Sequence, residues 1–377
     1  MASQHSSSWQ EVIDKNQIPI SRNFLVGLHL THFLSTRFAP NVTHYTQKFF
    51  HLQYFIERKD QQNIYDIGVD DAYYVVSWIV LLTFFRSFLM EWAFIPFARH
   101  VNKIHSRKAR MRFAEQSWMV TYYCFSFAFG FYIYRLSPHW HNIDNLYIGW
   151  PHYRMPSLFK KYYLVSIAFW FQQIVVLNIE KKRKDHVQML CHHIITVALV
   201  LGSYYYYYTR IGNMILMIMD SVDIFLSSAK ILKYSGWQRS CDAMFVLFLI
   251  SWVALRHGLY NYLYYHAWTK ARDLMFDSQC IPGILQKRCW TTTVVNVFLT
   301  LLGSLQFITC LWMYSILKVL NKVIHGDSAD DVRSDEDDSD VESEDDNKTN
   351  QTPETTDEDV TEKVDQESNT HAQNDSC

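Results

Sequence analysis

The chain has 377 residues, a length that would fill two or three soluble domains, yet 49% of its residues are hydrophobic and 16% are aromatic. Charged residues make up only 19%, with 11 glycines and 8 prolines, which is unlike an average soluble protein. The net charge of -2 and the mean hydropathy of -0.11 resemble those of a soluble protein only because they average two unlike parts.

The two parts meet at Gly326. Residues 327–377 hold 20 Asp and Glu against 3 Lys and Arg, whereas residues 1–326 hold 17 acidic and 32 basic residues. This division excludes one uniformly charged globule. The acidic part has too few apolar residues to bury a core, so residues 326–377 are predicted to be a disordered tail.

Runs of about 20 apolar residues, the length that crosses a bilayer core, predict an all-α bundle of transmembrane helices before the tail. The clear candidates are 73–96, 114–135, 160–180, 186–207, 241–263 and 292–320, with 211–231 as a seventh that carries two aspartates. An eighth candidate, 17–39, is interrupted by Arg and His residues and fits an interfacial helix equally well. We therefore expect a polytopic bundle of seven or eight spans.

Loop charges orient this bundle, because Lys and Arg stay on the cytoplasmic side of short loops. Three basic stretches fall on one side if every candidate spans: 99–112, 181–184 and 230–239. We expect these loops and the carboxyl terminus in the cytosol. The loops expected on the lumenal side are 136–159, 208–210 and 264–291.

The seven cysteines show no CxxC spacing, so neither a zinc site nor a dense disulfide framework is predicted. Cys280 and Cys289 fall in one lumenal loop, where an oxidising compartment permits a disulfide between them. Two free thiols are the alternative.

Ionisable residues inside apolar helices are costly unless they are paired or hydrated, so they mark candidate functional sites. His192 and His193 lie about two turns into the 186–207 helix, and Asp220 and Asp223 lie near the middle of the next one. Because Asp220 and Asp223 are three residues apart, both lie on one face of their helix. Because a short turn joins the two helices, we expect antiparallel neighbours and an imidazole–carboxylate cluster. The alternatives are ion pairs that only hold the helices, or a metal site of these four residues, for which nothing else supplies ligands.

The segment around these residues resembles the signature of ceramide synthases, the longevity-assurance family with a TLC domain. The matching motifs are His192-His193-Ile194-Ile195-Thr196, Thr209-Arg210-Ile211-Gly212, the pair Asp220 and Asp223, and Ala229-Lys230. The resemblance extends upstream through residues 68–92 and covers most of 17–325. Met219 and the Leu-Ser-Ser before Ala229 are similar to the fungal branch.

The resemblance implies a sphingosine N-acyltransferase of the endoplasmic reticulum. It would join an acyl-CoA thioester to the amine of sphinganine or phytosphingosine, with acyl-CoA as substrate and no cofactor or metal. For the fungal branch it implies a very-long-chain acyl group, a small single-span accessory subunit and a chain that can form homo- or hetero-dimers. It also divides the chain into an N-terminal segment with the weak span (1–72), a helix with a basic cytosolic loop (73–113), a TLC-type catalytic domain (114–325) and the tail (326–377).

Two mechanisms fit the histidines. One histidine either acts as general base while the amine attacks the thioester directly, or attacks the thioester itself to give an acyl-imidazole. One aspartate would hold the imidazole in a single tautomer, and the other would bind the ammonium or hydroxyls of the base. We select His192 and Asp220 as the closest pair.

Two charged stretches outside the helices complete the predicted sites. Lys181, Lys182, Arg183 and Lys184 lie at the cytosolic mouth of the histidine helix, where they would bind the phosphates of CoA; a topology signal is the alternative. In the tail, Ser334, Ser339 and Ser343 each precede an acidic residue by three positions, a pattern that acidophilic kinases read. A tail that only solubilises is the alternative there.

Two other functions stay open. A TLC-domain lipid transporter or lipid-sensing protein would use the bundle as a lipid pocket, but it has no need for both the histidine pair and the aspartate pair. A different membrane acyltransferase would use a single histidine in an unrelated helix pattern.

Overall fold

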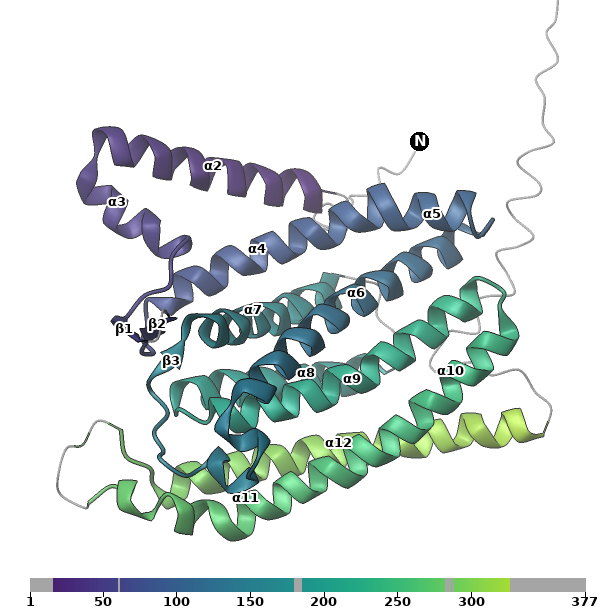
Figure 1. Cartoon of the computed structure of the whole chain (residues 1–377). Coiled ribbons are helices and arrows are strands. Elements are labelled where there is room, and N and C mark those ends of the chain that lie inside the picture. Colours follow the sequence, from purple (N-terminus) through teal and green to yellow (C-terminus); the bar gives the residue numbers. More distant parts are fainter. Residues whose placement is uncertain (1–15, 60–61, 180–184, 282–285, 287, 326–377) are drawn as a thin grey trace, which may run out of the picture. The chain divides into compact units, whose positions relative to one another are not determined.

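The computed structural model describes residues 16–325 except 60–61, 180–184, 282–285 and 287, and this part is mostly helical (Figure 1). The helices are α2 (Gln17–Phe38), α3 (Pro40–Thr46), α4 (Asp71–Leu89), α5 (Ile95–His100), α6 (Arg107–Leu136), α7 (Ser157–Ile179), α8 (His186–Tyr205), α9 (Thr209–Tyr234), α10 (Gln238–Ser251), α11 (Tyr260–Leu274) and α12 (Thr292–Ile324). Two π-helical segments, η2 (Met90–Phe94) and η5 (Trp252–Leu259), join α4 to α5 and α10 to α11. Short 3-10 turns are η1 (Gln47–Phe49), η3 (Pro138–Trp140), η4 (Ile143–Leu146) and η6 (Phe276–Ser278).

In the described part of the chain, five helical stretches are long and apolar enough to cross a membrane: Asp71–His100, Ser157–Ile179, His186–Tyr205, Gln238–Leu274 and Thr292–Asn321. They coincide with five of the predicted spans, so the chain is a multi-pass membrane protein. The predicted spans 114–135 and 211–231 are helices as expected, α6 and α9, but they are not among these five.

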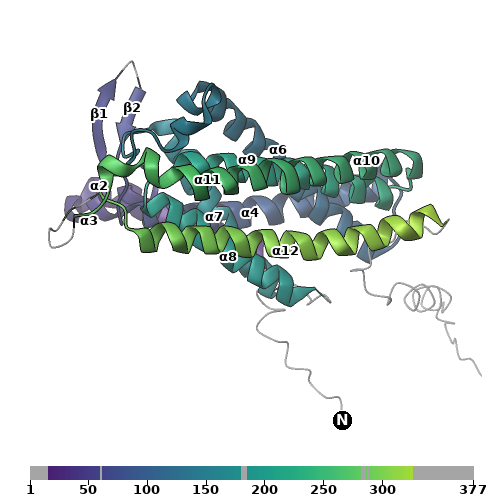
Figure 2. The ribbon, with the colours of Figure 1, turned by 90° about the horizontal axis from the view of Figure 1, so that it is seen from below.

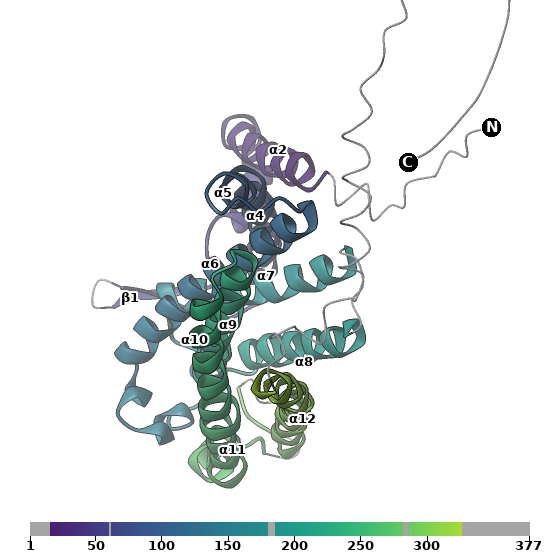
Figure 3. The ribbon, with the colours of Figure 1, turned by 90° about the vertical axis from the view of Figure 1, so that its right-hand side faces the viewer.

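The central helix is α9, which packs most extensively against α6 and then against α10. Helix α8 contacts α9, as the short turn between them predicts, but its larger contacts are with α7 and α12. Figure 3 shows α8 between α7 and α12. In Figure 2, α10 and α11 form one long rod with α12 beside it. The bundle therefore places the histidine helix and the aspartate helix together, each held by different partners.

Basic residues gather at one end of the bundle. Asn102, between α5 and α6, donates from Nδ2 to Oγ of Ser235, just after α9, over 2.8 Å. The basic loops 99–112 and 230–239 therefore lie on one side, as their charge predicts, at the right-hand end in Figure 1. The third basic stretch, 181–184, lies outside the described residues.

The opposite end carries a small sheet, so the prediction of an all-α fold is wrong in this detail. Strands β1 (Phe55–Lys59) and β2 (Gln62–Tyr65) form an antiparallel hairpin, and β2 pairs with β3 (Met155–Pro156) through Tyr65 and Met155. Strands of two to five residues are far shorter than the apolar runs that reveal spans. They join the loop before α4 to the loop before α7.

A buried lysine holds this end together. Lys160, in the first turn of α7, is fully buried, and its ammonium donates to the carbonyls of Gln53 (2.9 Å) and Asp66 (2.6 Å). It also pairs with the Asp71 carboxylate at 2.8 Å, and the Tyr204 hydroxyl of α8 donates to the same carboxylate over 2.8 Å. The loop from α3 to α4 is thereby fastened to α4, α7 and α8 at one point.

The predicted disulfide between Cys280 and Cys289 is present, with the two Cα atoms 4.8 Å apart. Next to it, Arg288 pairs with the Asp66 carboxylate and lies 4.1 Å from the centre of the Tyr153 ring. The loop between α11 and α12 is thus also joined to the hairpin end.

Helix α2 is the weak candidate at 17–39. It is held to α4 by Gln17, whose Oε1 accepts from Arg86 Nη1 (3.3 Å) and Ser87 Oγ (2.9 Å). Apolar side chains on its other faces, such as Phe33 and Phe38, are exposed and suit contact with lipid.

We expect Lys160→Met to destabilise the protein by about 3 to 5 kcal/mol, because it leaves the buried Asp71 carboxylate without its countercharge. The matched control is Lys161→Met, whose exposed side chain should matter by no more than about 0.5 kcal/mol. Thermal unfolding of both variants in the same detergent measures the difference. Equal transition temperatures would contradict a role for the buried pair.

Candidate active site

A cavity lies among α7, α8, α9, η5, α11 and α12. Its wall is mostly apolar, and on α12 it extends from Val295 to Leu305, a length of about 15 Å at about 1.5 Å per residue. At the hairpin end Tyr147 lines it and stacks on His266, whose Nε2 bonds to Asp144 at 2.7 Å. That hydrogen bond lowers the pKa of Asp144. Apart from tyrosines, the ionisable residues that line the cavity are His192, Asp223 and Arg256.

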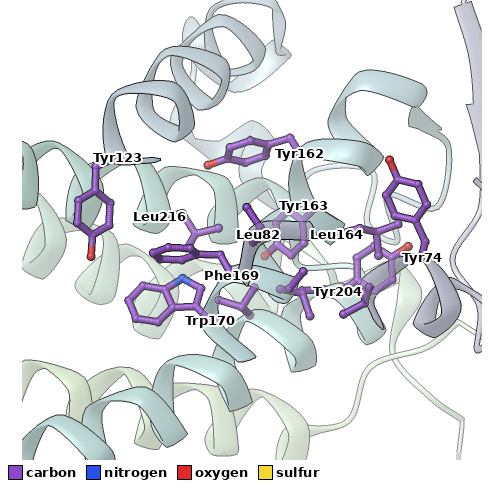
Figure 4. Packing of buried hydrophobic residues seen from close by; sticks show 14 of the residues in the cluster. Tyr74, Leu82, Tyr123, Tyr162, Tyr163, Leu164, Phe169, Trp170, Tyr204 and Leu216 are labelled. Carbon is purple, nitrogen blue, oxygen red and sulfur yellow. The ribbon is translucent and has the colours of Figure 1, made fainter. Parts of the chain in front are cut away.

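His192 lines this cavity from α8. Its ring lies between two indoles, with centroids 5.7 Å from Trp170 and 5.0 Å from Trp312. Figure 4 shows Trp170 beside Phe169 and Leu216 in the apolar core. His192 Nδ1 is buried and makes no hydrogen bond with any described residue. The imidazole is therefore held by aromatic packing and not by a hydrogen bond at Nδ1.

His193 is placed differently, as adjacent helix positions require. Its side chain is buried, and Nδ1 lies 2.6 Å from the carbonyl oxygen of Met189. Because that carbonyl can only accept, Nδ1 carries the hydrogen. His193 does not line the cavity, and its ring packs against Trp170 at 5.5 Å. It supports the same indole that contacts His192.

The two aspartates share a helix face but have different partners. Asp220 is buried, with 2% of its surface exposed, and accepts a hydrogen bond of 2.6 Å from Ser126 of α6. Asp223 lines the cavity and pairs with Arg256 of η5, with 2.7 Å between Oδ1 and Nη2. The carboxylate that shares the cavity with His192 is thus Asp223, whereas Asp220 was selected from the sequence. The rotation of α9 against α6, which sequence does not reveal, decides between them.

Arg256 is a site residue that the sequence analysis missed. It lies within the predicted span 241–263 and is only 4% exposed. The criterion that singled out His192 and Asp223, an ionisable residue inside an apolar helix, applies to it equally. Its guanidinium carbon lies 4.3 Å from the centre of the Trp252 ring.

The Thr209-Arg210-Ile211-Gly212 motif shapes the wall of the cavity. A Cβ atom on Gly212 would lie 1.8 Å from the hydroxyl oxygen of Tyr163, which is bonded to Ser203 of α8. Any larger residue would therefore displace the buried Tyr163 ring or the backbone of α9. Arg210 fixes the start of α9 by donating to the carbonyl of Asn145 over 2.6 Å.

Comparisons with known proteins show which proteins the chain resembles. A family model of the TLC domain matches residues 112–318. The chain is 38% identical to the sphingosine N-acyltransferase lag1 of Schizosaccharomyces pombe, over 81% of this chain and 76% of that protein. It is 32% identical to the ceramide synthase LAG1 of Saccharomyces cerevisiae, over 83% and 74%. With the sphingosine N-acyltransferase-like protein ALT7 of Alternaria alternata it shares 38% identity, over 73% and 69%.

The chain belongs to the ceramide synthase family. The TLC match begins in α6 and ends in α12, so it includes both histidines, both aspartates, Arg256 and every helix that lines the cavity. Helices α2 to α5 precede it and supply the hairpin end that Lys160 fastens.

The remaining predicted sites of this ceramide synthase family member lie outside the described residues. These are Lys181, Lys182, Arg183 and Lys184 before α8, and Ser334, Ser339 and Ser343 in the tail. Across the ranges that the structure describes, no three His, Cys, Asp or Glu side chains are grouped so that they could hold a metal ion.

Proposed function

We propose that the chain is an acyl-CoA-dependent sphingoid-base N-acyltransferase, which transfers a fatty acyl group from acyl-CoA to the amine of a long-chain base and forms a ceramide. The observation that carries this proposal is the cavity, which joins a histidine and a carboxylate to a long apolar wall. The names of the relatives, sphingosine N-acyltransferase and ceramide synthase, support it. The acyl group is already activated in its thioester, so the chemistry calls for no cofactor.

The apolar part of the cavity suits an acyl chain. A chain bound there would have its thioester beside His192. The amine can attack only in its neutral form, so a group must accept a proton from the ammonium. A neutral imidazole has a nitrogen lone pair that can accept this proton. His192 serves either as this base or as the nucleophile of an acyl-imidazole route.

The aspartates would act around this histidine. Asp223, in the same cavity, is placed to stabilise the charged imidazole or the incoming ammonium, in the way that carboxylates orient catalytic histidines. Asp220 and His193 are set back from the cavity and would support it, through Ser126 and Trp170 respectively.

From the fungal relatives we infer a very-long-chain acyl group, sphinganine or phytosphingosine as acceptor, and residence in the endoplasmic reticulum. We infer that α6 and α9 cross the membrane with the five apolar stretches, which with or without α2 gives the seven or eight spans and a cytosolic carboxyl terminus. Lys181 to Lys184 would then meet the CoA phosphates at the cytosolic surface.

The decisive experiment is ceramide formation in membranes that contain either the full chain or its His192→Ala variant, with sphinganine and acyl-CoAs of different chain lengths. We expect the wild type to form ceramide, fastest with very long chains, and the variant to lose at least about a hundredfold, the lower range of general-base catalysis. Wild-type membranes that stay silent even with an accessory subunit would favour a lipid transporter or sensor.

The matched control is Cys191→Ala, which changes the preceding residue of the same helix at an exposed position. It should keep wild-type activity. If His192→Ala folds and stays active, the histidine has no catalytic role even though the cavity holds lipid.

The tail offers a separate test. Protease added to sealed microsomes should remove residues after 326, because a cytosolic tail faces outward in such vesicles.

Mass spectrometry of the chain from growing cells should find phosphate on Ser334, Ser339 or Ser343. A protected tail would overturn the topology, and an unmodified tail would leave it a solubilising segment.

We also propose that the chain works with a small single-span subunit and forms a homo- or hetero-dimer. Gently solubilised from its native membrane, the complex should exceed the 44.8 kDa of one chain once bound detergent is subtracted. A mass of one chain alone would contradict both partners.

A further inference from the structure

Arg256 is an arginine where a membrane protein is expected to avoid one. It lies far inside the rod formed by α10, η5 and α11, and only 4% of its surface is exposed. The segment around it, η5, is π-helical rather than α-helical, and π-helical turns interrupt α-helices frequently at functional sites. Asp223 neutralises the charge of Arg256, but it does not provide an acceptor for every N–H group of the guanidinium.

The guanidinium has five N–H groups, and its bonds are unevenly distributed. Nη2 donates to Asp223 Oδ1 (2.7 Å) and to the carbonyl of Met219 (3.2 Å). Nε is buried and has no partner among the described residues. A buried donor without an acceptor destabilises a protein by about 1 to 3 kcal/mol. Since Arg256 lines the cavity, a ligand with a hydrogen-bond acceptor could remove this cost.

The guanidinium is also fixed in position. It stacks on the Trp252 indole, whose Nε1 donates to His257 Nε2 over 3.2 Å. The other ring nitrogen of His257, Nδ1, lies 3.0 Å from Nε2 of Gln306 on α12. Trp252 thus contacts the guanidinium directly, and His257 and Gln306 hold the indole in place.

The same aromatic packing leads from Arg256 to His192. The ring of Trp312 lies 6.4 Å from the ring of Trp252, on which the guanidinium stacks. The same Trp312 ring lies 5.0 Å from the ring of His192. Both His192 and Arg256 line the one cavity. A group bound against the imidazole would therefore have the guanidinium as a neighbour.

We propose that Arg256 is a catalytic residue whose free Nε–H donates a hydrogen bond to the carbonyl oxygen of the acyl thioester; this inference rests on the proposed function. Of the parts of acyl-CoA, the thioester carbonyl is the acceptor that follows directly after the apolar chain. The phosphates and the adenosine lie at the far end of a long polar arm and do not suit this apolar wall.

The reaction then balances as follows. The amine nitrogen, or His192 in the covalent route, donates its electron pair to the carbonyl carbon, and the π electrons of the C=O bond move to the oxygen. Arg256 stabilises this oxyanion without giving up a proton. The oxyanion re-forms the C=O bond as the C–S bond breaks and the thiolate of CoA leaves. In the direct route, the proton lost by the amine passes through His192 to that thiolate. In the covalent route, the thiolate takes the imidazole proton, the amine then attacks the carbonyl carbon of the acyl-imidazole, the C–N bond to His192 breaks, and the proton lost by the amine returns to the imidazole. Both routes give the amide and free CoA.

The test compares kcat and KM for acyl-CoA in the wild type, Arg256→Gln and Arg256→Lys, each as the full chain in membranes. An interaction made with the developing charge lowers kcat and leaves KM nearly unchanged. We expect Arg256→Gln to lose about 10²- to 10³-fold in kcat, as when an oxyanion donor is removed. Arg256→Lys keeps a positive charge beside Asp223 but has no Nε–H in that position, so it should also lose at least about tenfold.

Arg272→Gln is the matched control. It removes an arginine from the same rod, but one that bonds to Asn296 and does not line the cavity. It should keep the wild-type kcat. Should Arg256→Gln fail to fold in a thermal-shift assay, the lysine variant decides the question alone.

The outcomes separate two failures. Wild-type kcat in Arg256→Lys would show that the arginine is only the countercharge of Asp223, and a raised KM at constant kcat would show ground-state binding; either result overturns the inference. If the wild type and Arg272→Gln are both inactive even with an accessory subunit added, the proposed function itself is rejected.

Discussion

Asp223 and Arg256 neutralise each other in the interior of a bundle that is built to lie in lipid. Neither charge would be tolerated there alone, because a lone buried ion is destabilising by several kcal/mol. The pair joins α9 to the α10–α11 rod, and its oxygen-to-nitrogen distance of 2.7 Å leaves no room for water between them. Around it the cavity can be mostly apolar and still contain polar chemistry. The pair thereby reconciles a wall that accepts lipid with a site that handles charge.

The surroundings of the pair are aromatic rather than polar. Trp170, Trp252 and Trp312 pack against His192 and Arg256, and rigid rings fix these side chains without adding competing donors or acceptors other than their own N–H groups. A site held in this way keeps its hydrogen-bonding capacity for the ligand. The abundance of aromatic residues in the composition is in part explained by this use.

Much of the fold follows from the sequence because length and hydropathy suffice to locate membrane helices. The charge of the loops at 99–112 and 230–239 correctly put them on one side. The short strands were missed because their residues carry no long apolar run. Both aspartates were predicted as site residues, but Asp220 was selected over Asp223 as the partner of His192, since i, i+3 spacing shows that the two share a face but not which helix that face meets. Ser126 and Arg256 decide that, and both lie far away in the sequence.

The buried ammonium of Lys160 bears on how the TLC segment relates to the rest of the chain. The family model begins at residue 112, after Gln53, Asp66 and Asp71, yet these three residues supply the contacts that satisfy a lysine inside the matched region. A fragment cut at the family boundary would contain a buried charge with its partners removed. The TLC region of this chain matches a family model by itself, but it is not expected to fold without the preceding residues. Those residues therefore belong to the same cooperative structure.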